Sequence, residues 1–167
     1  MCEADAASRM LVSGNTSLLN NEHIQPGHAY AHPLFNCSER QPSHHQILVV
    51  EDDSTLATLE AGVLTAYGYT VVIVDTGEQA VAMLHNTIPD LVILDLDLTG
   101  TLNGWDVLQA LRVHATIPVL LTTSSVTAVR KHIRSRGETK LTLDHLPKPY
   151  PMQTLLKRIE RMLTIAS

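Results

Sequence analysis

The sequence predicts an α/β fold with a parallel sheet, and two of its patterns lead to this prediction. From Gln46 onward, short apolar runs alternate with segments in which apolar residues recur at helical spacing. Runs such as residues 47–50 and 91–94 are apolar throughout, which is typical of strands buried on both faces of a parallel sheet. Strand–helix pairs in strict succession indicate a doubly wound sheet with helices on both faces and right-handed crossovers.

The first two strand–helix pairs have clear boundary signals. The first strand is predicted at residues 47–50, and Gly68 marks the end of the helix predicted over residues 54–67. The second strand is predicted at residues 70–74. A capping box of the form S/T-x-x-E/Q starts at Thr76 and opens the second helix, because its side chains can satisfy the free amide groups of a first helical turn.

The last three pairs follow the same pattern. The third strand, at residues 90–94, leads to a helix that begins at Asn103-Gly104. The fourth strand, at residues 117–121, leads to a weaker helix, and the fifth, at residues 141–146, leads to a helix with Pro151 in its first turn. The apolar face of the weaker helix comprises Val126, Val129 and Ile133.

Residues 1–44 differ in composition from the rest of the chain. They are rich in Ser, Asn, His and Pro and have no continuous apolar stripe, so they cannot bury enough apolar surface to offset their ordering entropy. Their histidines and Cys37 match the spacing of a zinc site only loosely. The sequence therefore predicts a flexible polar extension at residues 1–44 and one folded domain at residues 45–167.

The overall composition excludes several classes of function. An apolar content of 44% allows a sizeable core, while a formal net charge of −5 provides no basic surface for direct binding to nucleic acid. No apolar run is long enough for insertion into a membrane, and the acidic N-terminus is unlike a signal peptide. Two cysteines cannot form a disulfide framework, so we expect a soluble, cytoplasmic protein.

A set of polar residues follows the predicted strands. Ligands of open parallel sheets bind beyond the carboxyl ends of the strands. Five polar residues fall there: Glu51, Asp52, Asp95, Thr123 and Lys148. Three carboxylates in one crevice repel each other unless a cation neutralises them, and their hard oxygens favour Mg²⁺. Because a hydroxyl and an ammonium group are the donors that a phosphoryl group needs, the set predicts an aspartate that accepts a phosphoryl group.

The chain from residue 46 to residue 166 resembles the receiver domain of two-component response regulators. The motifs that carry this resemblance are residues 47–53, residues 90–96, Asn103-Gly104, residues 117–123 and Lys148-Pro149. Each motif alone is weak, but their shared order and spacing are specific. The resemblance implies a flavodoxin-like (βα)5 fold with strand order 2-1-3-4-5, working in a phosphorelay.

The resemblance also implies a role for each residue of the set. Asp95 is the expected phosphorylation site, with a sensor histidine kinase or a histidine phosphotransfer protein as the donor and Mg²⁺ as the cofactor. The implied metal ligands are Glu51, Asp52, Asp95 and the backbone carbonyl of Asp97. Thr123 and Lys148 are implied to bind the phosphoryl group and to take part in the switch.

The chain departs from the family pattern in four places. Glu51 replaces the more usual aspartate and is longer by one methylene. Thr99 stands where the family usually has proline, in a loop that is one residue longer than usual. Thr122 and Thr123 compete for the switch hydroxyl, and we assign this role to Thr123 from its spacing to the preceding proline. His145 replaces the usual switch aromatic, so we expect a readout through the backbone after Thr123 with pH sensitivity near neutrality.

Three functions fit these residues. The favoured one is a stand-alone response regulator that is not an enzyme and acts through an unknown downstream protein. This expectation rests on the lack of a helix-turn-helix pattern in residues 1–44 and of sequence after Ser167, and it leaves a homodimer open. One alternative is a haloacid dehalogenase-like phosphatase, because Asp95, Asp97 and Thr99 fit its D-x-D-x-T signature. The other is a receiver-like docking module that is never phosphorylated.

The compositional break generates a first prediction. A chain that lacks residues 1–44 should still unfold in one cooperative thermal transition, because the apolar core is predicted to lie entirely after this segment. Circular dichroism during heating measures this transition for the truncated and the full-length chain. Loss of the cooperative transition on truncation would mean that the extension packs onto the domain.

Overall fold

The computed structural model describes residues 45–114, 116–125, 127, 129–130 and 138–166. The predictions for residues 1–44, including their histidines and Cys37, lie outside the described residues. So does most of the predicted fourth helix, of which only Thr127, Val129 and Arg130 are described as helical. Among the described helices, none is long and apolar enough to cross a membrane.

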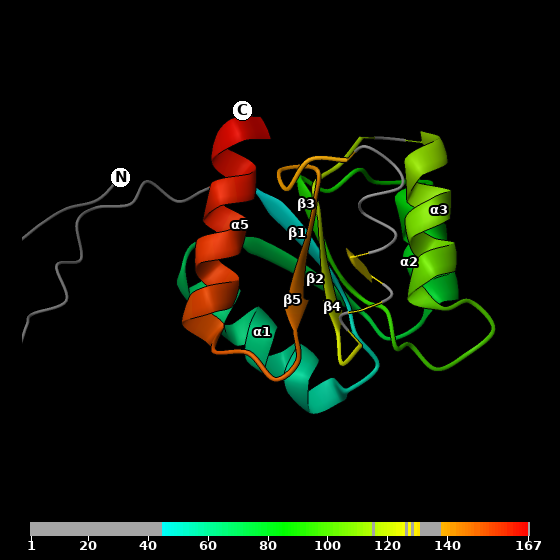
Figure 1. The fold of residues 1–167 in the computed structure, drawn as a ribbon, viewed down its shortest axis with the longest axis horizontal. Helices are drawn as coiled ribbons and strands as arrows, with labels where there is room; N and C mark the ends of the chain where they lie inside the picture. Colours follow the sequence, from blue (N-terminus) through cyan, green and yellow to red (C-terminus); the bar gives the residue numbers. More distant parts are fainter. Residues whose placement is uncertain (1–44, 115, 126, 128, 131–137, 167) are drawn as a thin grey trace, which may run out of the picture. The chain divides into compact units, whose positions relative to one another are not determined.

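A five-stranded parallel sheet forms the centre of the domain (Figure 1). Its order is β2-β1-β3-β4-β5, which confirms the predicted order. The registers place Ile47 opposite both Val71 and Leu91, and Asp95 opposite Thr122. The strands are β1 (Gln46–Val50), β2 (Thr70–Val74), β3 (Leu91–Asp95), β4 (Val119–Thr123) and β5 (Leu143–Pro147).

Helices cover both faces of the sheet, as the sequence predicts (Figure 1). On one face α1 and α5 pack on Ile47, Val49 and Ile93, and on the other α2 and α3 pack on Leu48 and Val50. Because successive side chains of a strand point to opposite faces, each strand supplies both cores at once. The helices are α1 (Ser54–Ala66), α2 (Gly77–Leu84), α3 (Gly104–His114) and α5 (Met152–Ala166).

Local signals in the sequence set where the helices begin. The Asp53 side chain accepts hydrogen bonds from the amides of Thr55 and Leu56, so Asp53 is the residue that caps α1. The Thr76 hydroxyl accepts the amide of Gln79 at 3.3 Å, as the capping box predicts. Side-chain caps of this kind satisfy amides that have no partner inside the helix.

The last three strands end later than the apolar pattern predicts. The prediction stops β3 at residue 94 and β4 at residue 121, whereas both strands continue through the polar residues that follow. The backbone ladder explains the difference, because the amide of Leu96 still donates to the Thr122 carbonyl and that of Lys148 to the Thr123 carbonyl. Hydropathy does not detect these hydrogen bonds, which hold the polar residues on a rigid sheet.

Two ion-pair networks stabilise the edge of the sheet formed by β5. Arg112, near the end of α3, pairs with Glu138 and donates to the backbone carbonyls of Ile117 and Thr142. The buried carboxylate of Asp144 on β5 accepts hydrogen bonds from two arginines of α5, Arg158 and Arg161. Burial of these charges is compensated only because each one is paired and hydrogen-bonded.

The start of α3 lies directly against the end of β3. A Cβ atom on Gly104 would stand 2.2 Å from the Asp95 carbonyl oxygen and 2.6 Å from the Leu96 Cα. Only glycine allows backbones to approach this closely. Gly104 therefore lets the helix sit beside the strand end that carries Asp95.

Replacing Gly104 by alanine tests this close approach. We expect Gly104→Ala to lower the free energy of unfolding by about 1–3 kcal/mol, because the new methyl group overpacks against backbone atoms that cannot rotate away. Gly62→Ala is the matched control, since Gly62 lies inside α1 with no atom within 4 Å of the added Cβ. That control should raise stability by about 0.5–1 kcal/mol through helix propensity. Urea unfolding measures both, and equal effects of the two substitutions would contradict the prediction.

Candidate functional site

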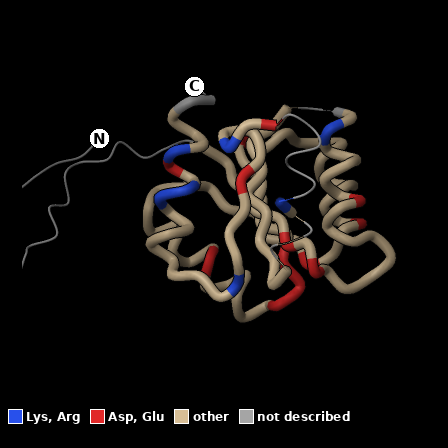
Figure 2. Tube along the Cα trace, in the orientation of Figure 1, with Lys and Arg blue, Asp and Glu red and all other residues tan. Residues whose placement is uncertain are grey.

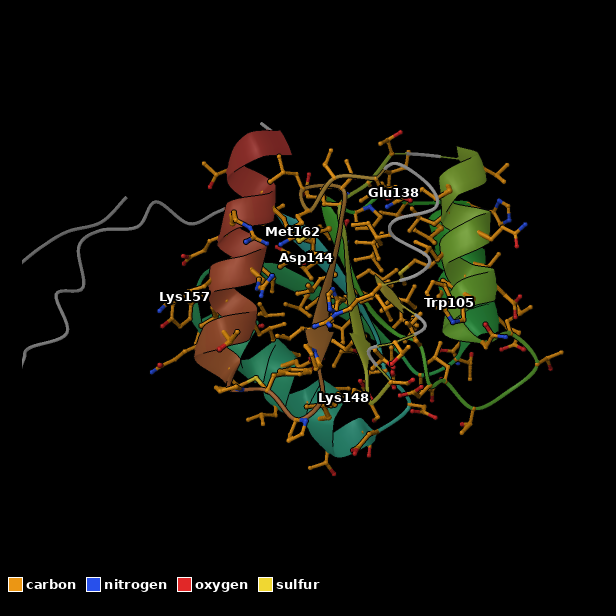
Figure 3. All side chains as sticks on the ribbon, in the orientation of Figure 1. Trp105, Glu138, Asp144, Lys148, Lys157 and Met162 are labelled. Atoms are coloured by element: carbon orange, nitrogen blue, oxygen red, sulfur yellow. The ribbon has the colours of Figure 1, made fainter. Side chains whose placement is uncertain are left out.

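Acidic residues and one lysine meet at the carboxyl ends of the strands. Acidic positions gather at this end of the sheet in Figure 2, and Figure 3 shows Lys148 where β5 leads toward α5. The Lys148 Nζ atom donates to both carboxylate oxygens of Glu51, at 3.0 and 2.8 Å, and to Asp95 Oδ2 at 2.7 Å. The structure thus brings together three of the predicted site residues at the carboxyl ends of β1, β3 and β5.

Strand alternation explains why these three side chains converge. Ile47 and Val49 face the core beneath α1 and α5, as do Leu91 and Ile93, so the next residues of the same parity in each strand are Glu51 and Asp95. The amide of Glu51 donates to the Val74 carbonyl, which keeps its backbone in the sheet. Both carboxylates are buried and project toward the same side of the strand ends.

Burial and the ion pairs have opposite effects on the pKa values of Glu51 and Lys148. Loss of water raises the pKa of Glu51 to about 7, although its hydrogen bond with Lys148 opposes this rise. Loss of water also disfavours the charged form of Lys148, but its hydrogen bonds to Asp95 and Glu51 outweigh this effect and raise the pKa of Lys148 above its ordinary value. The ammonium group therefore stays charged and partly neutralises the carboxylates.

Asp52 belongs to the same crevice but has a different partner. Its Oδ2 atom accepts the Thr99 hydroxyl at 2.7 Å and the Thr99 amide at 3.0 Å. The hydrogen bond from the Thr99 hydroxyl lowers the pKa of Asp52. Thr99 is thus a residue of the site that the sequence marked only as a departure from the family pattern.

The carboxylates of Glu51, Asp52 and Asp95 fit a single divalent cation. One oxygen from each lies within 4.8 Å of the others, so one ion can contact all three. Carboxylate oxygens without nitrogen or sulfur donors match the preference of Mg²⁺. The role of the Asp97 backbone carbonyl as a further ligand stays a prediction.

The Asp97 carboxylate contacts the residues at the end of β4. It accepts the Thr123 hydroxyl at 3.3 and 3.4 Å and the Ser124 amide at 2.9 Å, while its own amide donates to Asp95 Oδ1 at 2.9 Å. The Thr122 hydroxyl is buried and makes no hydrogen bond within the described part of the chain. Of the two competing threonines, Thr123 is therefore the one whose hydroxyl is linked to Asp95, through Asp97.

His145 lies apart from this network. It is half-buried on β5 opposite Leu121, two residues after Leu143, which belongs to the core beneath α2 and α3. Burial is the main cause that lowers the pKa of His145 below its ordinary value. The pH sensitivity near neutrality that the sequence suggests for His145 stays a prediction.

The loop between β3 and α3 is held by side chains outside it. Glu78 near the start of α2 accepts the amides of Thr101 and Leu102 at 3.2 and 3.1 Å. Leu102 packs so closely on Gly77 that a Cβ there would lie 2.5 Å from the Leu102 carbonyl oxygen. Glu78 was not among the predicted site residues. Its position in the capping box predicts a role at the start of a helix, and it does not predict a contact with this loop.

A contact between a buried glutamate and a half-buried tyrosine under the site was also missed from the sequence. Glu60 of α1 is fully buried and accepts a hydrogen bond from the Tyr150 hydroxyl, while its second oxygen has no partner among the described residues. Burial raises the pKa of Glu60, and burial together with the Glu60 contact raises the pKa of Tyr150. A glutamate at an inward helix position was the available signal, because charged residues are rarely buried.

Comparison with known proteins gives a consistent family match. The family model described as the response regulator receiver domain matches residues 47–160. The DNA-binding response regulator MtrA of Mycolicibacterium paratuberculosis is 33% identical over 118 residues, which are 71% of this chain and 51% of MtrA. The sensory transduction protein RegX3 of Mycolicibacterium smegmatis is 32% identical over 70% of this chain and 50% of its own length. The chain thus spans about half the length of these relatives.

Solved structures give the same result for the fold. The N-terminal domain of a response regulator/sensory box/GGDEF protein from Carboxydothermus hydrogenoformans is 32% identical, with a TM-score of 0.62 over 72% of this chain and 94% of that domain. The receiver domain of the Francisella response regulator 1452 shares only 19% identity but has a TM-score of 0.66, over 74% of this chain and all of that one. The second match concerns the fold alone.

The contact between Glu60 and Tyr150 generates a prediction about pH. Because the pKa of Glu60 is raised on folding, the folded state binds more protons than the unfolded state above pH 4.5, so this group costs more stability as the pH rises from there through its folded pKa. Glu60→Gln imitates the protonated form. The stability of this variant relative to the wild type should therefore increase with pH across that window.

Urea unfolding of both proteins at several pH values between 4 and 8 measures this difference. Tyr150→Phe removes a hydrogen bond that lowers the pKa of Glu60, so this variant should lose more stability than the wild type as the pH rises. Parallel pH profiles for the wild type and Glu60→Gln would mean that the pKa of Glu60 is the same in the folded and the unfolded state, which would contradict the prediction.

Proposed function

Because the chain belongs to the response regulator receiver domain family, we propose that it accepts a phosphoryl group on Asp95 within a two-component phosphorelay. The donor would be a phosphorylated histidine of a sensor histidine kinase or of a histidine phosphotransfer protein. The observation that carries this proposal is the contact of the Lys148 ammonium with Asp95 Oδ2 at 2.7 Å, at the carboxyl end of β3. An aspartate held beside a fixed positive charge is suited to receive a phosphoryl group.

The side chains present support each part of the transfer. An Asp95 oxygen forms the new bond to phosphorus as the bond between phosphorus and the donor nitrogen breaks, and the nitrogen keeps the electron pair. Lys148 offsets the negative charge that gathers on the phosphoryl oxygens. The amide of Asp97, at 2.9 Å from Asp95 Oδ1, fixes the orientation of the carboxylate.

Mg²⁺ is the cofactor that the acidic cluster supports. Receiver domains bind Mg²⁺ at such a cluster, and here Glu51, Asp52 and Asp95 would hold it. When bound, the ion supplies positive charge to the phosphoryl oxygens. Glu51 is also the carboxylate that binds Lys148 with both oxygens.

Thr123 is the residue that we propose to transmit phosphorylation. Its hydroxyl contacts the Asp97 carboxylate, and new acceptor oxygens on Asp95 offer it a stronger partner nearby. A shift of Thr123 would move the backbone that follows it, which leads to the exposed Arg130. We propose that a protein partner recognises this surface, with His145 in a minor role.

The site supports phosphorylation, but it does not identify the downstream effect of that phosphorylation. The names of the relatives include a DNA-binding response regulator, and these relatives are about twice as long as the matched segment. The stand-alone character, the absence of enzymatic turnover and the absence of direct nucleic-acid binding therefore stay predictions. We propose the cytoplasm as the location of the chain, where a kinase or phosphotransfer donor would meet it. A homodimer is compatible with this proposal.

Labelling with a small phosphodonor tests the proposed function. Incubation of the chain with acetyl phosphate and Mg²⁺ should add one phosphoryl group, and Asp95→Asn should abolish this addition because the acceptor oxygen is lost. Asp75→Asn is the matched control, since Asp75 is exposed and follows β2 at the same edge of the sheet. Intact mass spectrometry at neutral pH measures the addition.

The same samples separate the alternatives. A phosphatase would turn over p-nitrophenyl phosphate, whereas we expect no turnover from a phosphoacceptor. A docking module would take up no phosphoryl group in the wild type, and this result would refute the proposed function.

A further inference from the structure

Thr99 makes two hydrogen bonds to one metal-site carboxylate, and nothing in the family resemblance accounts for them. The hydroxyl and the backbone amide of Thr99 both donate to Asp52 Oδ2, at 2.7 and 3.0 Å. We propose that Thr99 is a positioning residue that orients Asp52 for the divalent cation. This inference rests on the proposed magnesium site and names the residue that tunes its affinity.

The geometry leaves one oxygen of Asp52 for the ion. Two donors on the same oxygen fix the rotation of the carboxylate about its last bond, so the other oxygen has one defined direction. An ionised carboxylate can accept up to four hydrogen bonds or metal contacts through its two oxygens, so the Thr99 contacts and a metal contact are compatible. Groups that orient a ligand in this way commonly strengthen metal binding.

The ammonium group of the site cannot perform this task. Lys148 is already bound to Glu51 and Asp95 through three hydrogen bonds. Thr99 supplies instead the two donors that orient the Asp52 carboxylate. The three carboxylates of the site therefore have two separate sources of support, a lysine for two of them and a threonine for the third.

The rest of the loop explains why Thr99 stays in place although its side chain is exposed. Gly100 has a φ of +133°, which turns the chain directly after Thr99. Beyond this turn, Glu78 holds the amides of Thr101 and Leu102. Proline in place of Thr99 could donate neither bond, because it has no hydroxyl and no amide hydrogen. The hydrogen bonds to Asp52 therefore require a residue with both a hydroxyl and an amide hydrogen at position 99.

A magnesium titration of the full chain tests the inference. Amide chemical shifts followed during addition of MgCl₂, without any phosphodonor, give the dissociation constant for each variant. Thr99→Val keeps the shape and the amide but removes the hydroxyl, and it should weaken Mg²⁺ binding about tenfold, whereas Thr99→Ser should restore affinity to nearly the wild-type value. Thr58→Val is the matched control, since the Thr58 hydroxyl donates to the Ser54 carbonyl of its own helix.

The outcomes separate this inference from the proposed function. Wild-type binding that Asp52→Asn weakens but Thr99→Val leaves unchanged would overturn the role of Thr99 and keep the magnesium site. Tighter binding by Thr99→Val would also overturn it, because the threonine would then compete with the ion. If the wild type and Asp52→Asn respond equally, the magnesium site itself fails, and the inference fails with it.

Discussion

The repulsion between carboxylates at the ends of β1 and β3 is the constraint on which the site depends. A parallel sheet directs Glu51 and Asp95 to the same side of its carboxyl edge, where both are buried. Two buried negative charges are unfavourable unless a positive charge compensates them. Lys148 meets this need through hydrogen bonds of 2.7–3.0 Å to both residues. The loop that carries Lys148 is in turn held to the sheet, because the amide of Lys148 donates to the Thr123 carbonyl.

The surroundings of Asp95 connect its chemistry to two neighbouring segments. One connection runs through Asp97 to the hydroxyl of Thr123 at the end of β4. The other begins at Asp52, the next acid in the crevice, and runs through Thr99 into the loop that Glu78 holds. A change of charge at Asp95 or the arrival of a cation therefore acts on two backbone segments that are already hydrogen-bonded to the site. Both segments are linked to the site by one or two hydrogen bonds, without intervening residues of the core.

The contact between Glu60 and Tyr150 has a different energetic character. A fully buried carboxyl group, one oxygen of which has no partner in the described part of the chain, lowers stability relative to an apolar residue of similar size unless it is protonated. Its position beneath the site also subjects it to the charges of Lys148 and Asp95. The charges of the site therefore also act on the protonation of Glu60.

The sequence by itself determined the fold class and, through its resemblance to receiver domains, the strand order. It also predicted the residues that meet at the strand ends, whereas the tertiary structure decided which side chains contact each other. Apolar runs without alternation identify buried strands, and a parallel sheet must bring their carboxyl ends together, so Glu51, Asp95 and Lys148 could be predicted as neighbours. The bond between Thr99 and Asp52 joins residues 47 positions apart, and that between Tyr150 and Glu60 joins residues 90 positions apart. Neither bond has a periodic signal, because hydropathy reports the burial of a segment but not the direction of a single polar side chain. Only the folded chain, in which loop lengths and packing set those directions, shows which donor reaches which carboxylate.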